Sequence, residues 1–263
     1  MTAWTISATD RLFDLGQPYF VGMPHHPAHP PFLFGLVKQH GDYVGPGGNS
    51  SASDALALGS HVGTHIDALC HFSCGGKLHG GEEAAGVQSY AGGLARHSID
   101  SIPPILRRGV LLDIAALEGG APLPADFEVT PAHLEAAAGA ARAGIEPGDV
   151  VLLRTGWAAY FRDAPRFINQ ARGPGPSLAG AQWLSARSIY AAGADTVAFE
   201  KLPDAAMPVH VHLLVEKGIH IIECLNLEEL AKAGVHEFLF VALPLKLEGA
   251  TASPIRPVAI AKA

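Results

Sequence analysis

Five short apolar runs constrain the fold of this 263-residue chain more than any other feature. Runs of four to eight apolar residues bounded by turn signals are typical of buried strands. Segments with a helical pattern or glycine-rich turns separate them, and this alternation predicts a single α/β domain over residues 1–263, with a mixed β-sheet flanked by helices. The predicted strands cover residues 109–114, 150–155, 196–200, 219–223 and 238–243.

The clearest predicted helix begins after Thr130, which suits the N-cap position, with Pro131 at the first helical position. An alanine-rich run follows to Arg142, and Gly144 is expected to close the helix. Residues 156–180 are polar and rich in glycine and proline, so we expect them to loop over the surface. Three further helices are predicted at residues 181–192, 209–217 and about 227–233.

Proline dominates the N-terminal part of the chain, where we expect an extended arm over about residues 17–53. The proline density of His25–Phe32 forbids a helix or a central strand, and the histidines of this tract are expected to be exposed. Phe32 and Phe34 are candidate substrate contacts, because apolar side chains on an irregular loop need a place to bury. Trp157 is a third candidate, with core packing as the alternative role.

Composition excludes several classes of protein. The formal charge of −7 and the absence of a Lys/Arg cluster argue against nucleic-acid binding. No apolar run reaches the length of about 18 residues that a membrane span needs. The three cysteines, Cys70, Cys74 and Cys224, form no CxxC pair, which favours free, buried thiols in a reducing compartment and a cytoplasmic protein.

Residues 58–74 carry the densest group of metal-binding side chain types, with His61, His65, Asp67 and His71. On a helix Asp67 would point away from the two histidines before it. On an extended chain positions 61, 63, 65 and 67 share one face, and Gly63 leaves room above the backbone. We therefore expect an extended segment with both histidines and the carboxylate on one side.

Two imidazoles and one carboxylate are typical ligands of a catalytic zinc or manganese ion, because three protein ligands leave one position open to water. Such an ion lowers the pKa of water toward neutrality. His71 would then be the proton carrier, since imidazole titrates near neutral pH. The alternatives are a purely structural metal site, or histidines with ordinary structural roles.

The run from His61 to His71 resembles the HxGTHxDxxxH signature of the cyclase family, which includes bacterial kynurenine formamidase and isatin hydrolase. The resemblance implies a swivelling β/β/α-like fold and one or two divalent metal ions, zinc or manganese, per subunit. It implies that His61, His65 and Asp67 hold a metal and that His71 is the acid/base residue. His210 with Glu223 would hold a second ion bridged by Asp67, with His212 as the rival of His210.

The leading hypothesis is a metal-dependent amidohydrolase that opens a cyclic amide such as isatin or cleaves an aryl formamide such as N-formylkynurenine. One alternative is a metal-dependent cyclase and dehydratase of polyketide-like substrates, and another is a metal- or ligand-binding protein without turnover. The resemblance also implies a homodimer or homotetramer in which the N-terminal arm reaches a neighbour's pocket. Glu200 is expected to be salt-bridged or solvated. His220 is expected to have a structural role.

Overall fold

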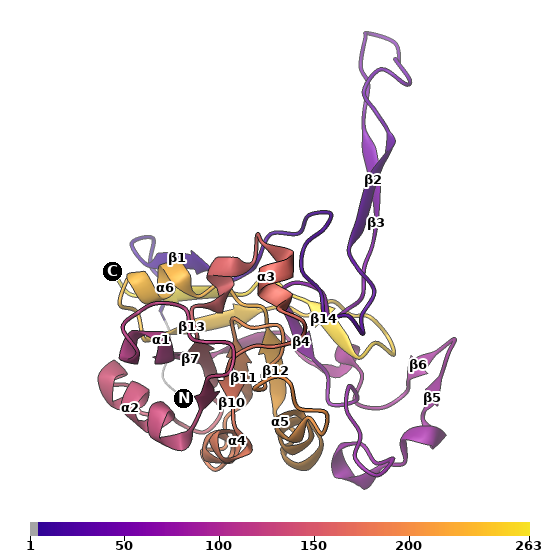
Figure 1. Cartoon of the computed structure of the whole chain (residues 1–263). Helices are drawn as coiled ribbons and strands as arrows, with labels where there is room; N and C mark the ends of the chain where they lie inside the picture. Colours follow the sequence, from indigo (N-terminus) through magenta and orange to yellow (C-terminus); the bar gives the residue numbers. More distant parts are fainter. Residues whose placement is uncertain (1–4) are drawn as a thin grey trace.

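Nine strands form one curled mixed sheet at the centre of the computed structural model, which describes residues 5–263 (Figure 1). The four central strands β7, β9, β11 and β12 run parallel, and the strands on either side pair antiparallel. This arrangement confirms the single-domain α/β fold with a mixed sheet. In spatial order the strands are β1 (Arg11–Asp14), β15 (Val258–Ala261), β13 (Glu237–Ala242), β7 (Ile105–Asp113), β9 (Val150–Arg154), β11 (Ala191–Ala194), β12 (His220–Glu223), β4 (His65–Asp67) and β14 (Ala252–Pro254).

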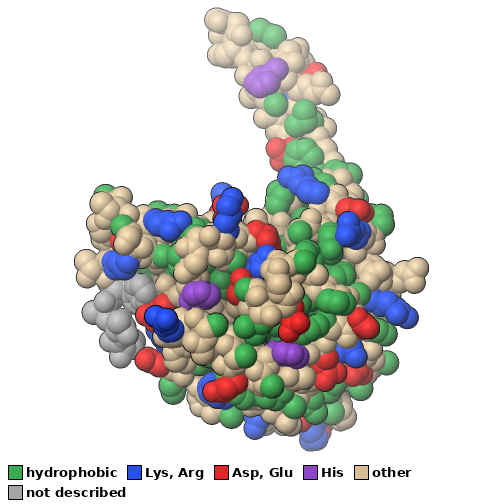
Figure 2. Space-filling view, turned by 60° about the vertical axis from the view of Figure 1, so that its left-hand side comes forward, with side chains coloured by type: hydrophobic (Ala, Val, Ile, Leu, Met, Phe, Trp, Pro, Cys, Tyr) green, Lys and Arg blue, Asp and Glu red, His purple; other side chains and the backbone are tan. Residues whose placement is uncertain are grey.

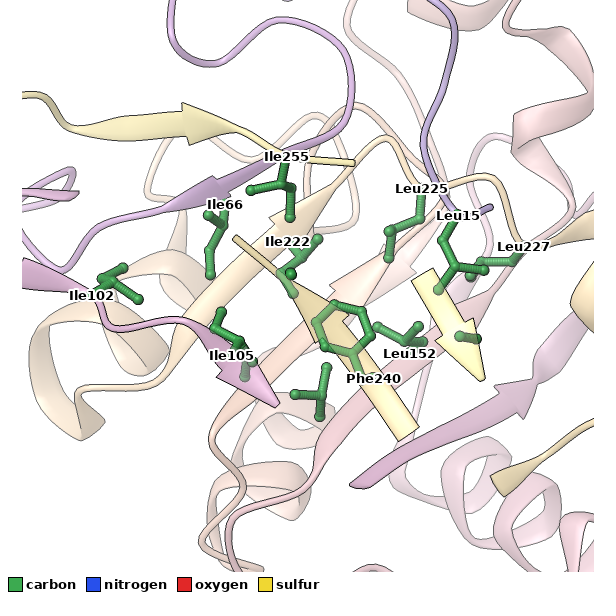
Figure 3. Close-up of a cluster of buried hydrophobic side chains, with 14 of the residues drawn as sticks. Leu15, Ile66, Ile102, Ile105, Leu152, Ile222, Leu225, Leu227, Phe240 and Ile255 are labelled. Atoms are coloured by element: carbon green, nitrogen blue, oxygen red, sulfur yellow. The ribbon is translucent and has the colours of Figure 1, made fainter. Parts of the chain in front are cut away.

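Both faces of the sheet are buried, and alternate residues of each central strand enter different cores. Leu152 belongs to the core drawn in Figure 3, together with Ile222 and Phe240. Leu153 faces the opposite core, which lies between the sheet and the helices in the lower part of Figure 1. Those helices are α2 (Pro131–Ala141), α4 (Leu178–Ser185), α5 (Pro208–His210) and its π-helical continuation η5 (Val211–Lys217), whereas α6 (Glu228–Lys232) packs on the first core.

The start of α2 is confirmed. Thr130 precedes the helix, Pro131 is its first residue, and the backbone N–H of Thr130 donates to Nδ1 of His133 at 3.0 Å. The helix ends at Ala141, one residue short of the predicted run, and Arg142, with a left-handed φ of 52°, closes it in place of Gly144.

The third predicted strand is wrong in position. The strand is β11, Ala191–Ala194, where the sequence pattern predicts the end of a helix at residue 192 and then a connecting segment, while residues 196–200 form bends. Small residues suit this crowded position, since a Cβ on Gly193 would lie 3.0 Å from side chains of Leu152 and Ile222 on the two adjacent strands. Tertiary packing here overrides the propensity of an alanine-rich run for helix.

Residues 156–180 do more than loop over the surface. They form η4 (Trp157–Tyr160), α3 (Ala164–Ile168) and β10 (Gly175–Pro176), which pairs with β8 (Glu128–Val129). Trp157, Phe161 and Phe167 are buried together, and the indole N–H of Trp157 donates to the carbonyl of Phe167 at 2.9 Å. The polar composition of the segment therefore did not predict the aromatic core that it forms.

The N-terminal arm ends in a two-stranded ribbon that projects from the body (Figures 1 and 2). It is built from β2 (Leu33–Lys38) and β3 (Ser53–Ala57), which pair antiparallel with a register shift between Leu36 and Lys38. Every residue of both strands except Lys38 is exposed. The ribbon therefore carries apolar side chains with little support from the rest of its own chain.

The remaining elements are short. Cys70 and Cys224 are buried free thiols as expected, whereas Cys74 is exposed, because it lies in a turn paired with Lys77 at the surface. Within residues 5–263 no helix combines the length and apolar character needed to cross a membrane.

The remaining short elements are α1 (Ile114–Leu117), β5 (Gln88–Ser89), β6 (Gly93–Leu94) and the 3-10 turns η1 (His79–Gly81), η2 (Ala84–Gly86) and η3 (Ile99–Ser101).

Candidate metal centre

The histidine-rich segment is part turn and part strand. Only His65–Asp67 is extended, as β4, so the prediction of one extended run from 61 to 67 is wrong for its first half. Gly63 turns the chain with φ of +66°. His65 and Asp67 still share a face because they are two residues apart on a strand, while Ile66 points the other way, into the core drawn in Figure 3. His61 reaches the same place through the turn.

Hydrogen bonds hold this turn against segments distant in the sequence. The hydroxyl of Tyr19 donates to the carbonyl of Val62 at 2.6 Å. The hydroxyl of Thr64 donates to the carbonyl of Cys224 at 2.7 Å and accepts from the backbone N–H of Gln17 at 2.8 Å. Thr64 therefore ties the segment to the residue directly after Glu223.

Strand pairing brings the remaining acidic group to the same point. Glu223, the last residue of β12, lies opposite His65 in the antiparallel pair with β4. Nε2 of His65 lies 3.3 Å from Oε2 of Glu223 and 3.5 Å from Oδ1 of Asp67. Nδ1 of His61 lies 2.8 Å from that same Asp67 oxygen, and Nε2 of His210 lies 3.1 Å from Oε1 of Glu223.

Each of three histidines has one ring nitrogen engaged away from this cluster. Nδ1 of His65 must carry a hydrogen, because it lies 2.8 Å from the carbonyl of Gly63, which only accepts. Nδ1 of His210 lies 2.8 Å from Oε2 of Glu200, and Nε2 of His61 lies 2.9 Å from Oγ1 of Thr251. The other nitrogen of each ring faces the carboxylates, as in histidines that bind metals.

Two atoms at the centre lack hydrogen bonds. Among residues 5–263, Nε2 of His65 and Oδ1 of Asp67 are buried polar side-chain atoms without a hydrogen-bond partner, despite their close neighbours. Buried polar atoms are rarely left unpaired. A nitrogen lone pair and a carboxylate oxygen are ligands of zinc and manganese, so these two atoms fit a divalent cation.

The charges around the cluster also favour a cation. Burial alone would lower the pKa of His65 and His210, but the neighbouring carboxylates raise both pKa values to about 10. Burial would raise the pKa of Glu223, yet His210 and His65 lower it to about 2. The buried carboxylates thus attract positive charge, which either protons or a metal can supply.

The ligand atoms fall into groups within 4.8 Å of one another that could hold a metal ion. Besides a group of His29, His61 and His71, there are two groups with a carboxylate: His61, His65 and Asp67, and Asp67, His210 and Glu223. Asp67 belongs to both. His212 lies apart from these groups, since its ring contacts Ser185 and Glu216 at 2.8 and 2.7 Å. The structure therefore brings His210, and not His212, to the cluster.

His71 lies beside the cluster, with its ring centre 3.9 Å from that of His61. Burial lowers the pKa of His71 to about 3, so the ring is neutral at pH 7. His220 has the structural role expected for it, because its Nδ1–H donates to the backbone carbonyl of Asp67 at 3.0 Å.

A cavity of about 270 Å³ opens beside these residues. Its wall includes His26 and His29 from the proline-rich tract, so the expectation of exposed loop histidines is wrong for both. The ring of His29 stacks on that of His61 with centres 4.5 Å apart, which only long-range folding could bring about. The cavity is lined by His26, Ala28, His29, His61, His71, Phe72, Val197, Ala198, Met207, His210 and Glu223.

The three predicted substrate contacts lie elsewhere within the chain. Phe32 is buried against Tyr19, with ring centres 5.6 Å apart, and Phe34 stacks on Phe32 at the base of the ribbon. Trp157 is buried in the aromatic core of η4 and α3. The structure thus brings the predicted polar residues together and places the predicted aromatic residues outside the cavity wall.

Comparison with known proteins places these observations in a family context. The sequence model of the family described as putative cyclase matches residues 13–201. The kynurenine formamidase of Bacillus cereus is 29% identical over 252 residues, which cover 95% of this chain and 97% of the relative. That of Bordetella petrii is 26% identical over 258 residues, covering 94% and 97%.

Solved structures extend the comparison to the fold. The crystal structure of a novel cyclase, 31% identical, superposes with a TM-score of 0.88 over 96% of this chain and 87% of that one. Isatin hydrolase A from Ralstonia solanacearum, 24% identical, has a TM-score of 0.75 over the full length of both chains and supports the fold alone. Kynurenine formamidase and isatin hydrolase are both hydrolases.

We expect Gly63→Ala to destabilise the protein and disturb the cluster. A Cβ at Gly63 would lie 2.7 Å from the ring of Tyr19 and 2.9 Å from Met23, on a backbone whose φ disfavours L side chains. The strain is expected to cost about 1–3 kcal/mol, measurable by denaturant unfolding. Gly35→Ala is the control, since a Cβ there meets nothing within 4 Å. Equal stability of the two variants would contradict this account.

Proposed function

Because the chain belongs to the putative cyclase family, we propose that it is a metal-dependent hydrolase that cleaves the carbon–nitrogen bond of a small aromatic amide. The observation that carries the proposal is the pair of unpartnered buried atoms, Nε2 of His65 and Oδ1 of Asp67, beside an open cavity. Their neighbours His61 and Glu223 line this substrate-sized cavity, so the unpartnered atoms lie one residue away from the space that a catalytic metal site needs.

We assign His61, His65 and Asp67 to one divalent cation, zinc or manganese, and Asp67, His210 and Glu223 to a second. The mixture of imidazole and carboxylate ligands suits either metal. Bound there, a divalent cation would polarise the amide carbonyl and make a water molecule more acidic. The chain's own contribution is to keep the ligand atoms converged and buried.

His71 is assigned the proton transfers. Its neutral ring lines the cavity beside His61, so it can accept a proton from the attacking water. The water oxygen bonds to the amide carbon, the carbon–nitrogen bond breaks, and the same proton passes from His71 to the departing nitrogen. The products are an amine and a carboxylic acid, which releases its remaining proton to solvent at neutral pH, and no other reactant is needed.

The substrate class follows from the cavity wall and from the relatives. Phe72, Val197, Ala198 and Met207 give the cavity an apolar side that suits an aromatic ring, while His26 and His29 add polar groups near the metal ligands. Kynurenine formamidases that match almost the whole chain favour an aryl formamide such as N-formylkynurenine. A cyclic amide such as isatin presents the same bond within a ring.

We also propose that the ribbon of β2 and β3 packs on a second copy of the chain in a homodimer or homotetramer. A two-stranded ribbon alone is marginally stable in water. Its apolar side chains are exposed, with about half or more of each accessible, as Figure 2 shows for the projecting end of the molecule. These side chains are Leu33, Phe34, Leu36, Val37, Tyr43, Val44 and Leu56.

A turnover screen tests the function. Metal-free protein, reloaded separately with zinc or manganese, is expected to hydrolyse N-formylkynurenine or isatin. The reaction is measured as the loss of substrate absorbance. Ring closure with loss of water from a polyketide-like substrate, and no hydrolysis, would favour the cyclase alternative. Purified protein without any bound divalent ion, and with no uptake on reloading, would contradict the metal-dependent assignment and favour a protein without turnover.

His71→Ala is expected to cut kcat by about 10²- to 10⁴-fold, the usual effect of losing an acid/base group, while the metal content stays near that of the wild type. His212→Ala is the control, because its ring contacts Ser185 and Glu216 outside the cluster. Turnover and elemental analysis are measured on both variants. Unchanged turnover in His71→Ala would refute the proton-transfer role.

Replacing Phe34 and Leu36 together by Ser is expected to shift the assembly toward monomer and to raise KM through loss of the neighbour's contact. Both side chains are about half exposed on the ribbon. Light scattering coupled to size exclusion gives the mass, and Leu12→Ser, an exposed residue of β1, is the control. A wild-type protein that is fully active as a monomer would contradict the assembly.

A further inference from the structure

Glu200 is a buried carboxylate whose bonds all lead to the segment that carries His210. The residue is 2% exposed. Its Oε1 accepts the backbone N–H of Val209 at 2.9 Å, and its Oε2 accepts the backbone N–H of His210 at 3.2 Å. The same Oε2 lies 2.8 Å from Nδ1 of the His210 ring. One carboxylate therefore fixes both the backbone and the ring of a single residue.

The ring contact determines which His210 nitrogen is free. An ionised carboxylate only accepts hydrogen bonds, so Nδ1 of His210 carries the hydrogen that it donates to Glu200. This leaves Nε2, on the opposite side of the ring, facing Oε1 of Glu223 at 3.1 Å. Without Glu200 the ring could rotate or place its hydrogen on Nε2, where it would oppose a cation.

The residue before Glu200 acts on the other side of the same site. The backbone N–H of Phe199 donates to Oε1 of Glu223 at 2.8 Å. Residues 199–200 thus contact both His210, the last residue of α5, and Glu223, the last residue of β12. The bend packs tightly as well, since a Cβ on Gly175 would collide with the backbone of Glu200.

We propose that Glu200 is a positioning residue that orients His210 for the second divalent cation, the one held with Asp67 and Glu223. This inference rests on the proposed function, and it assigns Glu200 no contact with substrate. A hydrogen bond from a metal-binding histidine to a carboxylate fixes the tautomer and raises the basicity of the ligand nitrogen, and its loss typically weakens metal binding by about 10- to 100-fold.

Glu200→Gln tests the role with a small change in shape. The amide keeps one acceptor oxygen but replaces the other with a donor, so it cannot accept all three N–H groups. Glu216→Gln is a matched control, because Oε2 of Glu216 makes the same kind of contact, at 2.7 Å, with Nδ1 of His212 on the continuing helix. That pair lies outside the metal groups.

Two measurements on the full chain give the result. Zinc titration is expected to show two ions per chain in the wild type and in Glu216→Gln, and second-ion binding weakened by about 10- to 100-fold in Glu200→Gln. Proton NMR is expected to show the Nδ1–H of His210, shielded from exchange by Glu200, in the wild type and in Glu216→Gln but not in Glu200→Gln. His210→Asn assigns the resonance.

Wild-type zinc affinity in Glu200→Gln, or a wild-type spectrum without the protected Nδ1–H of His210, would overturn the inference. The resonance does not require metal, so a wild-type chain that binds no ion would refute the proposed function while the spectrum still decides the role of Glu200. If Glu200→Gln does not fold, Glu200→Asp retains the charge with a shorter reach. Its second-ion affinity is expected to fall, and an unchanged value would overturn the inference.

Discussion

One oxygen of Asp67 is the point on which the site depends. Imidazole nitrogens of His61 and His65 approach Oδ1 of Asp67, yet this oxygen has no hydrogen-bond partner. Such an arrangement is unfavourable in a protein interior unless a positive charge lies among the groups. The surrounding fold holds the groups there, with β4 between β12 and β14 and the Asp67 carbonyl bonded to His220.

Burial makes this arrangement costly, because charged groups lose their hydration. Asp67, Glu200 and Glu223 are almost fully buried carboxylates, and the histidines between them offset part of the cost of desolvation. Because the two apolar cores pack on both faces of the sheet, the groups cannot separate to reach water. The rigidity of the sheet is therefore what allows several like charges to remain close together.

How much the sequence predicts depends on the range of the contacts. The segment from His61 to His71 was predictable because its spacing is local, and four of the five apolar strands were predictable because both their faces are buried. Strand β11 was missed because its small residues are dictated by neighbours on other strands. His29 and Glu200 were underestimated for a similar reason, since each acquires its role only by contact with a histidine from another element.

The cross-strand pairing of His65 with Glu223 has a consequence for how the chain can vary. Side chains alternate between the faces of a strand, so a slip of one residue in β4 would send His65 and Asp67 into the apolar core and expose Ile66 to the cluster. The same three residues thus encode both the interior and the reactive surface. An insertion or deletion within this strand would disrupt the fold and the site together. A change in the length of the projecting ribbon would leave the register of the central sheet unchanged.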